Sequence, residues 1–187
     1  MITVICGPMF AGKTTEVWKV LDRSFYEKKS TIAISPTSDT RGESDQIVAR
    51  NGLSQNSISI SDNIRDNEDA IYHFLRVEHS FDVVVFDESQ FFKGITPLVR
   101  RLHKEGVEVY CAGLDTDYRM QTFGEMGELL AIANRVKKLT SVCKKCQGEA
   151  SRTQRIVDGV ESLSGDLVLI GDSESYESRC DSCYHSL

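Results

Sequence analysis

The sequence predicts an α/β protein whose parallel β-sheet carries helices on both faces, followed by a small β-rich domain that binds a metal. Three observations carry this prediction. Apolar runs alternate with helical patterns from Ile2 to about Val136, every residue from Val83 to Phe86 is apolar, and two Cys-x-x-Cys pairs stand near the C-terminal end. An unbroken apolar run indicates burial on both faces, which is typical of a central strand in a parallel sheet.

The first strand and helix are predicted at the start of the chain. The apolar run 1–6 reads as a strand, and 31–34 as the next one, stopped by Pro36. The helix between them shows residues at helical spacing, namely Val17, Val20, Leu21, Ser24 and Phe25. The segment 37–63 is polar and rich in turns, so we expect a long loop there.

The later elements repeat this alternation and make a right-handed parallel sheet the expected topology. Asp66 is expected to cap a helix that extends to about Leu75. A further helix should have Thr96 as its N-cap and Pro97 at its first position, and the strand 107–113 should follow it. The last helix is expected from Gly127 to Val136.

Composition and size exclude several classes of protein. The chain has 187 residues, 40% of them hydrophobic, which suits a domain at 1–138 with an appended domain at 139–187. No apolar run approaches the roughly 20 residues that span a bilayer. The first strand leaves no room for a signal peptide, so we expect a cytoplasmic protein. A net charge of −6 argues against a general nucleic-acid binder.

A Gly-x-x-x-x-Gly-Lys-Thr motif follows the first predicted strand and opens the first predicted helix. Its residues are Gly7, Pro8, Met9, Phe10, Ala11, Gly12, Lys13, Thr14 and Thr15. In this context the motif is a phosphate-binding loop, because its N–H groups and the helix N-terminus converge on one anion. Lys13 is expected to reach the β- and γ-phosphates, and Thr14 to ligate Mg²⁺. The motif predicts a P-loop fold of the RecA-like kind, whereas a chance turn is the disfavoured alternative.

An acidic pair, Asp87-Glu88, ends the apolar strand at Phe86. Asp87 is expected to hold the Mg²⁺ of a bound nucleotide, directly or through water. Glu88 is expected to face the reacting groups as a general base. The alternative is an acidic pair that merely ends a strand in solvent.

Aromatic residues cluster around the ends of the next strands. The segment 113–124 should lie over the same carboxyl edge of the sheet, where ligands of α/β proteins bind. Tyr118 and Phe123, together with Phe91, are candidates to line a slot the size of a nucleobase. Core packing is the alternative for each of them.

The two Cys-x-x-Cys pairs match a tetrahedral Cys₄ zinc site. Its ligands would be Cys143, Cys146, Cys180 and Cys183. Because no coordination position stays open, the zinc is expected to be structural. A redox dithiol is the alternative for either pair, while Cys6 and Cys111 lie in predicted strands and are expected to be core thiols. Lysines near the first pair are interpreted as a solvated face rather than a nucleic-acid contact.

These motifs occur together in one order along nearly the whole chain. They are the phosphate loop with its Pro-Met-Phe, Asp39-Thr40-Arg41, Asp87-Glu88-Ser89-Gln90-Phe91-Phe92, Gly113-Leu114-Asp115, Phe123-Gly124, the double Cys-x-x-Cys and Tyr176. Together they resemble the cytosolic-type (type II) thymidine kinases. The resemblance implies transfer of the γ-phosphate of ATP to the 5′-hydroxyl of thymidine, with Mg²⁺ as cofactor, a structural zinc, a homotetramer and inhibition by thymidine triphosphate.

The resemblance also implies roles for single residues. Glu88 would be the general base, and Arg41 would lie at the reacting phosphates. Met9, Phe91, Leu114 and Phe123 would surround the thymine, with Tyr118 where Phe is common. A lasso loop at about 161–177 would close over the nucleoside through backbone groups near Leu167, Leu169 and Gly171, with Tyr176 also in contact. Ser89, Thr122 and Asp172 depart from the usual pattern.

Two other function classes compete with this interpretation. Asp-Glu-Ser-Gln also resembles a helicase box, but a second motor domain is missing and the net charge does not suit strand tracking. A zinc-ribbon binding module that uses ATP as a switch is the other. A GTPase is disfavoured because no Asn-Lys-x-Asp occurs.

Overall fold

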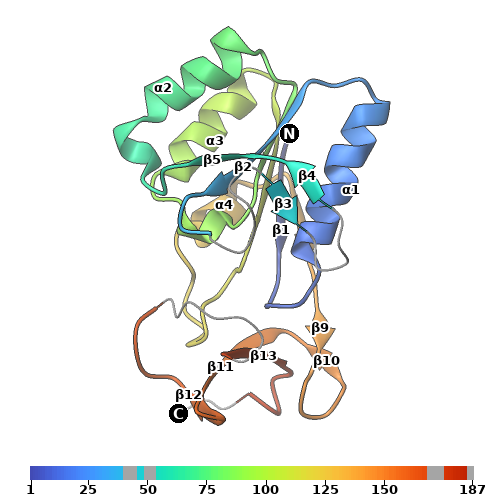
Figure 1. Cartoon of the computed structure of the whole chain (residues 1–187), viewed down its shortest axis with the longest axis vertical. Helices are drawn as coiled ribbons and strands as arrows, with labels where there is room; N and C mark the ends of the chain where they lie inside the picture. The colour runs from blue at the N-terminus through green and yellow to red at the C-terminus, as the bar shows by residue number, and fades with distance from the viewer. Residues whose placement is uncertain (40–45, 49–53, 168–174, 185–187) are drawn as a thin grey trace.

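A computed structural model of the chain describes residues 1–39, 46–48, 54–167 and 175–184, with only the backbone at 46–48 and 54–56 (Figure 1). Among these residues, six parallel strands form the central sheet in the order β5-β2-β6-β7-β1-β8. The strands are β1 (Ile2–Cys6), β2 (Thr31–Pro36), β5 (Ile58–Ile60), β6 (Val83–Phe86), β7 (Glu108–Gly113) and β8 (Arg135–Lys138). The predicted parallel α/β sheet is confirmed.

Helices cover both faces of this sheet (Figure 1). On one face lies α1, and on the other lie α2, α3 and α4. Their bounds are Lys13–Tyr26 for α1, Glu68–His73 for α2, Ile95–Lys104 for α3 and Met126–Ile132 for α4. Val17 and Leu21 of α1 pack on Ile5 and Val85, while Leu98 of α3 belongs to a separate core on the other face. Burial on both faces explains why β6 is apolar throughout.

Three helix boundaries differ from the sequence prediction. Helix α2 takes Asn67 rather than Asp66 as its N-cap, because Asp66 belongs to a short 3₁₀ turn. Helix α3 begins at Ile95 after Gly94, so Thr96 is not its N-cap. The predicted helix from Gly127 to Val136 ends at Ile132.

The second half of that last helix is instead an edge strand. Strand β8 pairs with β1, and the side chain of Asn134 accepts a hydrogen bond from the Ile2 amide at 2.7 Å. All four β8 residues are exposed and three are basic, so no apolar pattern marks the strand. Three strands lie in the segment 37–63, where only a loop was expected. Strands β3 (Gln46–Val48) and β4 (Ser54–Asn56) form an antiparallel ribbon, and β5 is the other edge strand of the central sheet. In α1, Phe25 shares the helical spacing of the core-facing residues, but it is 75% exposed and does not join the core.

The C-terminal segment forms small antiparallel sheets below the carboxyl ends of the central strands (Figure 1). One sheet pairs β9 (Ser141–Val142) with β10 (Glu149–Ala150). The other has the order β12-β11-β13, with bounds Val160–Ser162 for β12, Arg152–Val157 for β11 and Tyr176–Arg179 for β13. The β-rich character predicted between the cysteine pairs is confirmed.

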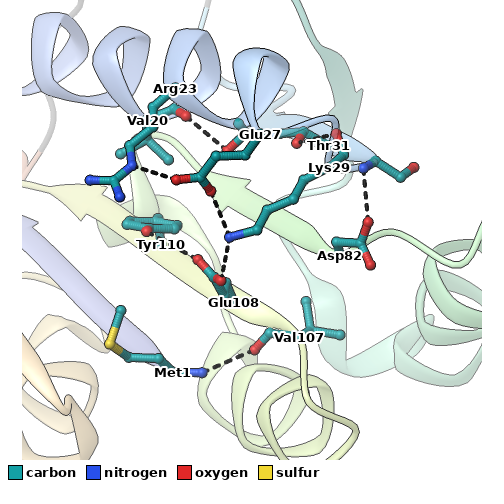
Figure 2. Close-up of polar contacts among 12 residues, drawn as sticks. Met1, Val20, Arg23, Glu27, Lys29, Thr31, Asp82, Val107, Glu108 and Tyr110 are labelled. Carbon is teal, nitrogen blue, oxygen red and sulfur yellow. Dashed lines mark hydrogen bonds and ion pairs between the residues drawn. The ribbon is translucent and has the colours of Figure 1, made fainter.

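An ion-pair network lies at the opposite end of the sheet, near the amino ends of its strands (Figure 2). The Lys29 Nζ lies 2.8 Å from Glu27 and 2.7 Å from Glu108, and Arg23 bonds to Glu27 at 2.7 Å. Hydrogen bonds from Lys29 and Arg23 lower the pKa of Glu27 to about 2. The network therefore ties the end of α1 to β7, on the far side from the phosphate loop. In the described part of the chain, no helix has the length and apolar character to cross a membrane.

Candidate functional site

The phosphate loop connects β1 to α1. Gly12 takes a left-handed conformation (φ 81°) as the N-cap of α1, and Lys13 is the first helical residue. Lys13 is 8% exposed, and its ammonium donates to the carbonyls of Pro8 at 2.8 Å and Gly7 at 3.3 Å. Its side chain thus lies inside the curve of the loop, where an anion held by the helix N-terminus would meet its charge.

The C-terminal sheets hold this loop from outside. The Met9 amide donates to the Thr153 Oγ1 at 3.0 Å, and the Ser141 hydroxyl donates to the Phe10 carbonyl at 3.2 Å. Both contacts join residues more than 130 positions apart in the chain. The middle of the loop is therefore fixed by β11 and β9 as well as by its own turn.

The acidic pair lies at the carboxyl end of β6, and both residues are buried, with exposed fractions of 5% for Asp87 and 6% for Glu88. Glu88 has a left-handed backbone (φ 47°), an uncommon conformation for a residue other than glycine. The Asp87 Oδ1 accepts a hydrogen bond from the Glu88 amide at 2.9 Å, which supports this turn. Strand β7 separates β6 from β1, so two strand spacings, about 10 Å, lie between the acidic pair and the phosphate loop.

The predicted aromatic residues form two groups at the same edge. The rings of Phe91 and Phe123 meet edge to face, with centroids 5.5 Å apart. Tyr118 is 2% exposed, and its ring lies under the guanidinium of Arg155 at 3.9 Å. The Tyr176 hydroxyl accepts a hydrogen bond from Arg155 at 2.9 Å. The structure therefore brings Tyr118 and Tyr176 together around one buried cation.

The described start of the predicted lasso is held against this second group. The carbonyl of Gly165 accepts from the Tyr118 hydroxyl at 3.0 Å and also from Arg119. The carbonyl of Asp166 accepts from Arg155 at 2.6 Å. Leu167, next in the chain, is 45% exposed. Arg41, Leu169 and Gly171 lie outside the described residues.

A family model described as thymidine kinase matches residues 1–184 of the 187. The chain belongs to the thymidine kinase family. It is therefore an ATP-dependent kinase whose substrates are ATP and thymidine, and the resemblance inferred from its motifs is confirmed. The matched residues include the phosphate loop, the acidic pair and both cysteine pairs of this family member.

The four predicted zinc ligands of the kinase meet at one point. Among the described residues, the sulfur atoms of Cys143, Cys146, Cys180 and Cys183 lie within 4.8 Å of one another. The sulfur atoms of Cys146 and Cys180 are 3.6 Å apart. Two sulfur ligands of a tetrahedral zinc ion, with Zn–S bonds of about 2.3 Å, lie roughly 3.8 Å apart, which is close to this distance. This donor set therefore fits a zinc ion.

The pKa values of two of these thiols are shifted in opposite directions. Burial opposes ionisation of Cys143, but hydrogen bonds from the backbone amides of Cys180, Cys146 and Lys145 bring its pKa to about 6. Hydrogen bonds with Cys180 and Cys146 raise the pKa of Cys183 to about 12. Backbone amides thus favour a thiolate in this cluster, and a bound metal would displace the thiol protons. Cys6 and Cys111 are buried in strands, as predicted.

Sequence reasoning missed three side chains that organise the site of this kinase. Gln90 bonds to the carboxylate of Glu88, Thr153 holds the phosphate loop, and Arg155 joins Tyr118 to Tyr176. Gln90 is itself part of the recognised motif that begins at Asp87, so its place there was a usable signal. Thr153 and Arg155 carried none, because their partners are far away in the sequence.

Proposed function

We propose that this kinase transfers the γ-phosphate of ATP to the 5′-hydroxyl of thymidine, giving thymidine monophosphate for DNA precursor salvage. The observation that carries the proposal is the position of the phosphate loop and the buried Glu88 on either side of the end of β7. Phe91 follows Glu88 closely in the chain and meets Phe123, so the two rings offer an aromatic wall for a base. A donor and an acceptor bound at this edge would face each other for in-line transfer.

The loop residues from Gly7 to Thr15 would hold the phosphates of ATP. The Lys13 ammonium would leave the carbonyls of Gly7 and Pro8 and bond to the β- and γ-phosphate oxygens. Thr14 and Asp87 supply the hydroxyl and carboxylate oxygens that suit Mg²⁺. When bound, Mg²⁺ would neutralise charge on the transferred phosphate.

Glu88 would act as the general base. Its carboxylate would accept the proton of the 5′-hydroxyl while that oxygen attacks the γ-phosphorus, and the bond to the bridging oxygen of ADP would break. Arg41 would lie at the reacting phosphates and stabilise their charge. These two residues and Lys13 make up the proposed catalytic set.

The thymine would lie among residues from both parts of the chain. Met9, Leu114, Tyr118 and Tyr176 would surround it with the Phe91–Phe123 pair, and backbone groups near Leu167, Leu169 and Gly171 would read its edges. We propose a division into a nucleotide-binding domain at 1–138 and a zinc-binding domain at 139–187. A lasso at about 161–177 would then belong to the second domain, with zinc holding the segments that flank it.

Assembly and regulation follow the family pattern in this proposal. The kinase would form a homotetramer in the cytoplasm, and thymidine triphosphate would inhibit it as an end product. Size-exclusion chromatography with light scattering tests the tetramer, and a monomer at micromolar concentration would contradict it.

Substitution of Glu88→Gln tests the catalytic role. A positioned general base contributes roughly 10²–10⁴ in rate, so kcat should fall by that factor while thymidine still binds. Glu128→Gln, an exposed glutamate of α4, is the matched control and should keep the wild-type rate. Weakened thymidine binding with an unchanged kcat would instead make Glu88 a structural residue.

The acceptor is tested by supplying ATP with thymidine, deoxycytidine, deoxyadenosine or no acceptor. We expect a monophosphate product mainly from thymidine. ATP consumption that needs single-stranded DNA and yields no nucleoside monophosphate would refute the kinase reaction and favour a nucleic-acid motor.

A further inference from the structure

Gln90 is a buried amide that links two parts of the proposed site. Its Nε2 donates to the Glu88 Oε2 at 2.5 Å, and its Oε1 accepts from the Leu114 amide at 3.0 Å. Gln90 is 3% exposed. One amide group thus contacts the proposed base at the end of β6 and the backbone of a proposed thymine neighbour at the end of β7.

Two glycines leave space for Gln90, one beside its side chain and one beside its backbone carbonyl. A Cβ on Gly113 would lie 2.5 Å from the Gln90 Oε1, and a Cβ on Gly124 would lie 2.1 Å from the Gln90 carbonyl oxygen. Both separations are shorter than a carbon and an oxygen atom tolerate. The absence of side chains at Gly113 and Gly124 therefore lets the 3₁₀ turn Ser89–Phe91 lie close to the end of β7 and to the backbone at Gly124.

An amide in this position fixes the orientation of the Glu88 carboxylate as well as its distance from β7. The Leu114 amide can only donate, so it orients the Gln90 carbonyl oxygen toward itself and the NH₂ toward Glu88. A carboxylate held by such a donor presents its oxygens in one orientation, which matters because misplacement by about 1 Å can cost roughly 10²-fold in rate.

We propose that Gln90 is a positioning residue that orients the Glu88 carboxylate toward the acceptor hydroxyl and couples it to the nucleoside wall at Leu114. This inference rests on the proposed function, because it takes Glu88 as the base. Gln90 does not contact the reacting atoms in this scheme. It acts through Glu88 on kcat and through Leu114 on the binding of the nucleoside.

Two substitutions separate these contacts. Gln90→Glu keeps an acceptor for Leu114 but replaces the amide donor with a second carboxyl group against Glu88. The two carboxyl groups must share a proton or repel each other. Glu88 is then no longer a free, oriented base, so kcat should fall roughly 10- to 100-fold while the KM for thymidine stays within about twofold. Gln90→Met removes both contacts, so kcat should fall similarly and the KM for thymidine should rise. Ser89→Ala is the control, because the Ser89 hydroxyl lies in the same buried turn and donates to the Phe86 carbonyl at 3.0 Å.

A double-mutant cycle decides whether Gln90 works through Glu88. In a Glu88→Gln background, Gln90→Glu should change kcat less than about twofold, since the group it positions is gone. An equal loss in both backgrounds, or a kcat of Gln90→Glu close to wild type, would overturn the inference. If the wild-type protein phosphorylates thymidine and only the cycle fails, the proposed function survives; if the wild type forms no thymidine monophosphate, both fall. Should Gln90→Met not fold, Gln90→Glu alone decides.

Discussion

Removing the carboxylate of Glu125 should destabilise the folded protein through the N-terminus of α3. The helix begins after Gly94, which has no side chain to cap it. Glu125, which precedes α4, supplies the missing acceptor: its carboxylate receives the amides of Gly94 at 2.5 Å and Thr96 at 3.0 Å. A side-chain cap of this kind contributes roughly 0.5–2 kcal/mol.

From this contribution, Glu125→Ala should lower the melting temperature by about 1–8 °C, since 1 kcal/mol shifts a chain of about 190 residues by roughly 2–4 °C. Thermal unfolding followed by circular dichroism measures the shift. The control is Glu128→Ala, an exposed residue in the first turn of α4. Equal melting temperatures of Glu125→Ala and the control would refute the capping argument.

The dependence on pH provides a second check. Burial alone would raise the pKa of Glu125, but hydrogen bonds from Thr96, Gly94 and Arg65 together lower it. A carboxyl with a depressed pKa in the folded state stabilises above its unfolded pKa, near 4.3, and loses this effect as pH falls through the folded value. The stability difference between the wild type and Glu125→Gln should therefore be constant from pH 6 to 8 and shrink below about pH 4.

Three further outcomes follow from the structure. Arg155→Met loses the hydrogen bond to Tyr176, so the KM for thymidine should rise about tenfold while the KM for ATP stays unchanged, by steady-state kinetics. Metal analysis should give one zinc per chain, and a chelator that removes it should lower the melting temperature; an unchanged value would contradict a structural zinc. Burial raises the pKa of Cys6 to about 11 and of Cys111 to about 12, so neither thiol of the native protein should react with Ellman's reagent at pH 8 until the chain unfolds.

Local signals in the sequence were enough to predict the central fold. Each of the phosphate loop, the acidic pair and the cysteine pairs is a short pattern whose chemistry depends on neighbours within a few residues. The buried strand β6 is equally local, because hydrophobicity alone shows burial on both faces. These elements were found in the predicted order.

Edges and long-range contacts carried no such signal. Strand β8 is held by backbone pairing to β1, which leaves no pattern in its side chains. Its residues are exposed and mostly basic, and basic residues are also typical of the last turn of a helix. The cap of α3 was misjudged because its acceptor, Glu125, comes from 29 residues away. Arg155 could not be assigned to the site either, since a buried arginine looks like a surface residue in the sequence.

Strand β11 connects the two substrate sites that the proposal requires. Thr153 and Arg155 are two residues apart and therefore share one face of this strand. Thr153 holds the phosphate loop and Arg155 holds the tyrosines of the nucleoside side. Strand β11 pairs with β13, which leads directly into Cys180. A shift of the cysteine cluster would thus move the residues that contact the phosphate donor and the nucleoside together. A structural zinc would therefore affect the binding of both substrates.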